Sequence, residues 1–121
     1  MSKKIIFSLF IIFSINNAIF AAPKNNFVPG VSDLPVPINF TLKDDSSSVF
    51  FSDAGRIVEA TFEGKGEYDD ILNFYNKTLR ALGWKIKGKL KYSREGEILR
   101  IHLNIRGENL EIEFSLRPEK K

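Results

Sequence analysis

Basic side chains gather in the last third of the chain, and they are the residues best suited to a chemical role. They are Lys85, Lys87, Lys89, Lys91, Arg94, Arg100, His102 and Arg106. Every second residue from 85 to 91 is a lysine, so on a single strand these lysines would share one face. The four residues that follow would extend this face across a paired strand. Such a surface would bind anions, for example acidic lipid headgroups, a phosphate-bearing sugar polymer or an acidic protein.

Two structural explanations compete with anion binding. Lysines on an edge strand protect a sheet against stray pairing. In addition, Glu111 and Glu113 could neutralise Arg100 and His102 across a strand ladder. No aromatic residues interleave with the basic ones, so the stacking platform of single-stranded nucleic-acid binders is missing. We therefore expect no nucleic-acid partner.

Groupings suited to catalysis or metal binding are not found in the sequence. His102 is the only histidine and there is no cysteine, whereas zinc sites and nucleophilic catalysis need several such groups. Glu59 and Glu63 would lie roughly 13 Å apart along one strand, too far to act on one bond. We expect no catalytic residue, no metal site and no cofactor, and hence a protein that is not an enzyme.

A helix is predicted from Glu67 to Trp84. Its apolar residues recur at helical spacing, at Ile71, Leu72, Phe74, Tyr75, Leu79 and Leu82. Asp69 and Asp70 stand in the first turn, where carboxylates are favoured. Gly83 stands where a left-handed residue would end the helix.

The other elements are predicted strands in which apolar and polar residues alternate. They cover residues 38–42, 48–52, 56–63, 84–92, 97–106 and 110–116. Clean alternation indicates one buried and one wet face, which is typical of an antiparallel sheet. The predicted fold is α+β: a two-layer sandwich with one amphipathic helix on a mainly antiparallel sheet of about five strands, in the order β-β-α-β-β-β.

The N-terminus, residues 1–21, is predicted to be a secretory signal peptide. Two lysines precede an apolar run from Ile5 to Ile15, and small residues stand at Ala21 and Ala22. Cleavage is expected after Ala21, because cleavage after Ala22 would leave Pro23 beside the scissile bond. An uncleaved anchor remains the alternative, since counting through Ala22 brings the apolar stretch close to the ~20 residues of a spanning helix.

The rest of the chain is divided by composition. Residues 22–37, rich in Pro and Asn, are predicted to be a linker, 38–118 a single α+β domain, and 119–121 a basic tail. A short extended segment could still lie against the domain through Val28, Leu34, Val36 and Ile38. Removing the signal peptide takes away Lys3 and Lys4 and no acid, so the net charge falls from +3 to +1. A nearly neutral exported domain gives no electrostatic argument for nucleic acid.

The helix-to-strand segment resembles a motif of small exported bacterial proteins of unknown function. The motif is Phe74-Tyr75-x-x-x-Leu79-x-x-Leu82-Gly83-Trp84, with Asp53-x-Gly55-Arg56-Ile57-Val58-Glu59-Ala60 before it and Arg94-Glu95-Gly96-Glu97-x-Leu99 after it. The resemblance spans roughly Leu34 to Pro118 and implies a signal peptide and one small α+β domain. It supplies no activity. Arg56 and Glu97, which begin strands beside glycine turns, could pair with each other, rim a shared surface or only flank turns.

Together these features predict a small, non-enzymatic binding or adaptor module of the cell envelope, periplasmic or secreted. Its partner would be an envelope protein or an anionic envelope component, and no stable membrane span is expected after signal cleavage. The alternative is an anion- or lipid-headgroup-binding domain that uses the Lys85–Lys91 strand face. A third reading is a hydrolase with an unrecognised site. The sequence indicates neither the identity of the partner nor the oligomeric state.

Overall fold

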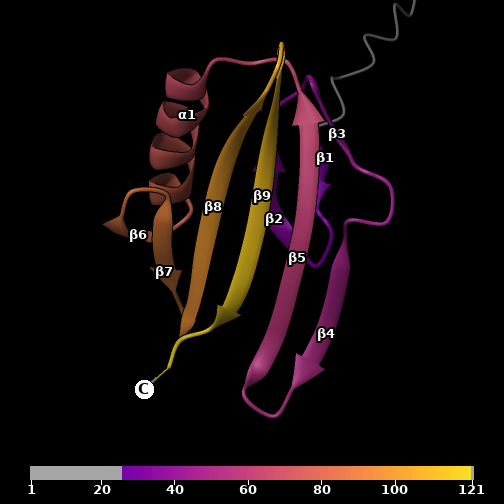
Figure 1. Cartoon of the computed structure of the whole chain (residues 1–121). Helices are drawn as coiled ribbons and strands as arrows, with labels where there is room; N and C mark the ends of the chain where they lie inside the picture. The colour runs from indigo at the N-terminus through magenta and orange to yellow at the C-terminus, as the bar shows by residue number, and fades with distance from the viewer. Residues whose placement is uncertain (1–25, 121) are drawn as a thin grey trace, which may run out of the picture.

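A computed structural model describes residues 26–120 of the chain, which form nine strands and one helix (Figure 1). The elements, in chain order, are β1 (Asn26–Val28), β2 (Val31–Val36), β3 (Phe40–Leu42), β4 (Ser48–Ser52), β5 (Gly55–Gly64), α1 (Tyr68–Ala81), β6 (Lys85–Gly88), β7 (Lys91–Arg94), β8 (Glu97–Arg106) and β9 (Asn109–Pro118). The expected signal peptide, residues 1–21, lies outside the described residues.

Seven of the strands form one antiparallel sheet. Its order is β3-β5-β9-β8-β7-β6, and β4 also pairs with β5. β3 and β4 share one edge of β5, with β3 opposite residues 62–64 and β4 opposite residues 55–59. β9, the last strand in the sequence, lies between β5 and β8 at the centre of the sheet.

The helix covers one face of this sheet, called here the inner face. Ile71, Tyr75 and Leu79 are its buried residues, and the Tyr75 ring lies 5.7 Å from the Phe114 ring of β9, edge to face. Gly83 has φ of +91°, and the Trp84 N–H donates to the Leu79 carbonyl at 2.9 Å. This is the 6→1 hydrogen bond of a Schellman stop, so the helix and its glycine end are confirmed.

β1 and β2 form a separate two-stranded hairpin that covers the inner face beside the helix, behind β5 and β9 in Figure 1. Its residues Val28, Val31, Leu34 and Val36 belong to the same buried core as the helix and the large sheet. The buried Tyr75 hydroxyl donates to the Pro35 carbonyl at 3.0 Å and joins helix to hairpin. Residues 26–36 are thus part of the folded unit, where a linker over 22–37 was expected.

The predicted fold class is wrong. An α+β sandwich of about five strands was expected, whereas residues 26–120 are mainly β, with nine strands in two sheets and one helix. One difference is the N-terminal hairpin, which was not predicted because its prolines indicated a linker. The other is the predicted strand 84–92, which is two short strands, β6 and β7, separated by a turn at Lys89–Leu90.

Other predicted strands are confirmed. The runs 48–52 and 97–106 match β4 and β8, and β4 and β5 form the expected hairpin. Val58, Ala60 and Phe62 all point into the core, as their alternation predicts. Ile105 was predicted to point inward but is 72% exposed.

Candidate interaction surface

The four lysines do not form the expected ladder on one face. The chain reverses at Leu90, which has φ of +54° and is buried, so β6 and β7 run antiparallel to each other. Lys85 and Lys91 lie on the outer face, opposite the helix. Lys89 lies on the helix side, with its Nζ 5.1 Å from the centroid of the Tyr68 ring.

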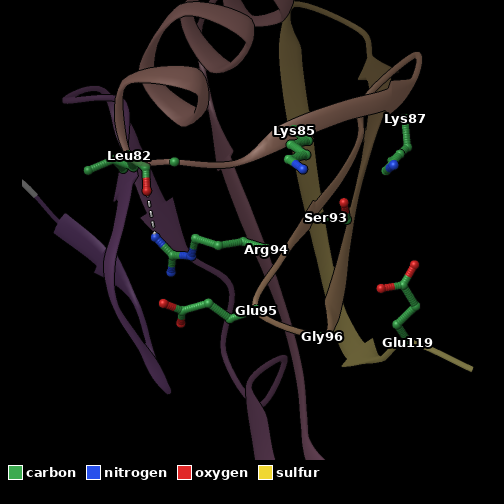
Figure 2. Close-up of a pocket in the computed structure, with 9 residues that line it drawn as sticks. Leu82, Lys85, Lys87, Ser93, Arg94, Glu95, Gly96 and Glu119 are labelled. Carbon is green, nitrogen blue, oxygen red and sulfur yellow. Dashed lines mark hydrogen bonds between the residues drawn. The ribbon is translucent and has the colours of Figure 1, made fainter.

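Figure 2 shows a polar hollow of about 490 Å³ beside β6. Lys85 and Lys87 line it together with Arg94, but so do Glu95 and Glu119. Because charges of both signs meet in this hollow, its field does not single out anions.

Arg94 is engaged within the protein. Its guanidinium donates to Asp33 at 2.6 and 3.1 Å and to the Leu82 carbonyl at 3.0 Å, and it lies 4.3 Å from the centroid of the Trp84 ring. The hydrogen bond from Arg94 holds the pKa of Asp33 below its ordinary value. Arg94 therefore ties the β1–β2 hairpin to the end of the helix, and its donors are used there.

Arg56 makes a second tie to the same hairpin. It donates to both carboxylate oxygens of Glu97, at 2.8 and 2.9 Å, and to the Gly30 carbonyl at 2.8 Å. Of the roles considered for Arg56 and Glu97, direct pairing is confirmed. A bidentate arginine–carboxylate contact fixes direction as well as distance, which suits a structural clamp between strand and turn.

The remaining basic candidates lie on the outer face of β8. His102 stands opposite Glu113, as the ladder argument predicted, whereas Arg100 stands opposite Ser115 rather than an acid. Arg106 lies near the far end of the strand. Arg100 and His102 lie together in a hollow of the outer face, but the carboxylates of Glu59 and Glu113 line the same hollow.

Glu111 is the buried carboxylate of this face. It accepts a hydrogen bond from Lys43 Nζ at 2.7 Å and lies 3.5 Å from Arg106 Nε. The Lys43 hydrogen bond is the main cause that lowers the pKa of Glu111. Arg106 therefore already contacts a buried carboxylate of the protein itself.

Three consecutive large apolar side chains of β4 are exposed. They are Val49, Phe50 and Phe51, named here the β4 patch; Phe50 is 52% exposed and Phe51 is 80% exposed. Phe50 lies on the outer face, opposite Ile57, whereas Val49 and Phe51 lie on the inner-face side, opposite Val58 and Arg56. β4 is therefore apolar on both sides, unlike the half-polar strands of the sheet.

An apolar hollow continues the β4 patch on the outer face. It has a volume of about 490 Å³ and is lined in part by Ala54, Ile57 and Pro118. Ile57, which lines this hollow, is the cross-strand partner of Phe50.

The two edges of the sheet contrast with each other. β6, at one edge, carries Lys85 and Lys87 and its pairing shifts register before Gly88. Lysines and irregular pairing are common protections against edge-to-edge association. β4, at the other edge, has neither lysine nor proline and pairs with β5 in regular register. The β6 edge therefore carries features that prevent edge-to-edge pairing, and the β4 edge lacks them.

A second apolar hollow, of about 500 Å³, lies between the helix and the segment that follows β2. Phe74 lines it with Pro35, Pro37 and Ile38. Phe74 also packs edge to face on Tyr75 at 4.9 Å. It is half-buried, so part of its ring packs against the core and part remains exposed.

Sequence reasoning found β4 as a strand but missed it as a surface. The signal was present, since Ser48–Ser52 carries three consecutive large apolar residues and no charge. What the sequence lacked was the position of this strand at an open edge, which depends on the pairing of β5 with β9.

Within residues 26–120, no cluster of histidine and acidic side chains is arranged to hold a metal ion. Over the same residues, the helix is too short and too polar to cross a bilayer. No family model, curated protein or solved structure matches the chain.

Proposed function

We propose that this protein is an exported, non-enzymatic binding or adaptor module of the cell envelope, and that it contacts its partner through the β4 patch. The observation that supports this proposal is the open, apolar edge strand, set against a lysine-bearing edge on the other side of the same sheet. Exposed apolar clusters of this kind mark interaction sites in soluble proteins. An edge strand can also add a partner strand through its backbone.

The internal pairing of charges supports the same choice. Arg56 and Arg94 donate hydrogen bonds to the β1–β2 hairpin. Lys43 and Arg106 both contact the carboxylate of Glu111. Residues that are already paired have less to gain from an anionic ligand, because the existing contacts must be broken first. The apolar patch loses nothing comparable on binding.

Photocrosslinking in cells tests the contact surface. A photoreactive residue at Phe50 is expected to capture a specific envelope protein. The same residue at Ile86, which is 45% exposed on the opposite edge, serves as the matched control. Failure to capture any envelope protein from position 50, or an identical set from both positions, would overturn the proposed surface.

Export is tested separately. The protein recovered from the envelope fraction is expected to begin at Ala22, as read by mass spectrometry of its N-terminal peptide. An intact chain that begins at Met1 and remains in the cytoplasm would contradict export.

A second candidate function is binding of an anionic headgroup. It would use Lys85 and Lys87, which line the hollow of Figure 2, although Glu95 and Glu119 on the same hollow weaken its attraction for anions. This function predicts salt-sensitive binding to anionic vesicles. Replacing Lys85, Lys87, Lys89 and Lys91 by Gln should abolish that binding. Binding that persists in the variant would exclude the lysines as its cause.

A further inference from the structure

We propose that two copies of this chain pair with each other through β4, antiparallel and in a two-fold register centred on Phe50. The inference rests on the proposed function and names the partner of the same surface as a second copy of the chain. It follows from three properties of β4: an available backbone edge, a self-complementary sequence and a lack of opposing charges.

The backbone edge of β4 is available. Among the described residues β4 pairs only with β5. Ser52 and Gly55 are paired across a two-residue turn. The two residues that flank such a turn form a hydrogen-bonded pair, in which each N–H donates to the other residue's C=O. Because hydrogen-bonded and non-hydrogen-bonded pairs alternate, the N–H and C=O groups of Val49 and Phe51 are those that point away from β5.

The sequence of β4, Ser-Val-Phe-Phe-Ser, is nearly the same read in either direction. In a register centred on Phe50, each serine meets a serine and Val49 meets Phe51 of the second copy. Val49 of one copy and Phe51 of the other would then form hydrogen-bonded pairs, because the backbone N–H and C=O groups of both residues point away from β5. A two-fold interface requires one patch that complements itself, and this strand provides it.

The side chains in this register match on both faces. The two Phe50 rings would meet across the two-fold axis on the outer face, next to the two Ile57 side chains. They form a non-hydrogen-bonded pair, in which opposing side chains are closest. On the inner-face side, Val49 of each copy would meet Phe51 of the other, and Phe51 is the most exposed of the large apolar residues.

Charge does not oppose this pairing. Ser46 to Ser52 carry no charge, and Asp53 would fall opposite Ser47 of the second copy rather than opposite an acid. A strand without charged residues cannot select a different protein by charge complementarity, whereas its nearly palindromic sequence matches a second copy of itself. A second copy is therefore the occupant that the strand fits best.

The expected dimer is weak. With 52% and 80% of their surfaces exposed, and about 200 Å² for each whole side chain, the two phenylalanines offer about 260 Å² per copy. Both copies together would bury less than half of the roughly 1,200 Å² at the low end of stable interfaces. We expect a dissociation constant in the micromolar range or above, so that the dimer forms at high local concentration.

Sedimentation equilibrium of the naturally processed protein tests the inference. The wild type is expected to shift from monomer to dimer as its concentration rises to about 500 µM. Phe50→Lys should remain monomeric over this range, because two ammonium groups would face each other at the axis. Ile86→Lys, on the opposite edge, should dimerise like the wild type. Circular dichroism of each variant verifies that it is folded.

Cysteine substitution gives a second measurement that does not depend on affinity alone. The chain contains no cysteine, so Phe50→Cys would introduce a single thiol at the two-fold axis. Opposing residues of a non-hydrogen-bonded pair have Cα atoms about 4.5 Å apart, within disulfide range. Mild oxidation should give a disulfide-linked dimer of Phe50→Cys, at least tenfold faster than for Ile86→Cys.

Two results would overturn the inference: a wild type that stays monomeric at the highest concentration, or equal oxidation rates for the two cysteine variants. The proposed function fails differently. If position 50 captures another envelope protein in cells while self-pairing is absent, the binding surface stands and the second copy is excluded. If position 50 captures nothing in cells and self-pairing is also absent, both proposals are wrong.

Discussion

Replacing Gly64 by Ala should displace β3 from the sheet, because an added Cβ has no room. That atom would lie 2.2 Å from the Asn39 carbonyl oxygen and 2.9 Å from Phe40 Cα. Both are backbone atoms, so no side-chain rotation can relieve the contact. Phe40 pairs with Gly64 in the β3–β5 ladder and is fully buried, and a shift of the backbone would therefore unseat its ring.

The expected loss of unfolding free energy for Gly64→Ala is about 2–4 kcal/mol. Overpacking of a closed site costs roughly 1–3 kcal/mol, and partial loss of Phe40 burial adds a share of the roughly 1.5–3 kcal/mol that full burial of such a side chain contributes. A domain of this size has about 5–15 kcal/mol in total. The variant should fold, but with a lower denaturation midpoint.

Gly96→Ala is the matched control. Gly96 has φ of +78°, and a Cβ there meets no heavy atom within 4 Å. Its cost is backbone strain alone, about 1–2 kcal/mol. Urea titrations followed through the fluorescence of Trp84, the only tryptophan and a buried one, measure both variants. A loss for Gly64→Ala below about 0.5 kcal/mol, or below that of Gly96→Ala, would refute the argument from space.

Three further outcomes are expected. Leu79→Ala should lower the unfolding free energy by about 2–5 kcal/mol in the same titration, because Leu79 is fully buried between helix and sheet; a loss under about 1 kcal/mol would show that the helix is not anchored there. Tyr75→Phe should cost about 1 kcal/mol and speed hydrogen exchange in the β1–β2 hairpin, because the Pro35 carbonyl loses its donor; unchanged exchange would argue against that tie. Because Arg94 lowers the pKa of Asp33, the ion pair should stabilise the fold above about pH 4 and lose its effect as the pH falls through the lowered pKa. The difference between wild type and Asp33→Asn, at most about 1 kcal/mol for a partly exposed pair, should therefore shrink in acid; a difference that grows there would have the wrong sign.

The helix and its end could be predicted because their signals are local. The apolar stripe, the acids of the first turn and Gly83 all lie within one segment, and the Schellman hydrogen bonds follow from that order. Alternation likewise gave the bounds of β8, and the short apolar run between two serines gave those of β4. These elements need no knowledge of what packs against them.

The N-terminal hairpin could not be found in this way. Pro35 lies inside β2, where a proline usually argues against a strand. The two-stranded hairpin tolerates it because β2 has β1 on one side only, and the Pro35 carbonyl is used by Tyr75. Only the buried positions of Leu34 and Val36 in the folded protein reveal the segment as part of the core.

The lysine run was misleading because its alternation continues through a turn. Leu90 takes a left-handed conformation that leucine rarely adopts, and Gly88 is the single local sign of a break. The candidate basic surface was accordingly predicted as one face. Conversely, the β4 patch was underestimated, since exposure at an edge depends on strand order. That order is set by pairs of distant residues, such as Val58 with Leu116.

The central position of β9 has a consequence for how the protein is made. β5 and β8 have no contact in the ladder except through β9, so neither can complete its pairing until residues 109–118 have been synthesised and delivered. Local hairpins can form at once, but the large sheet must wait for distant residues to meet, which slows folding. Late completion of the sheet would suit the export proposed above, because a chain that has not yet closed its sheet can thread through a translocation channel.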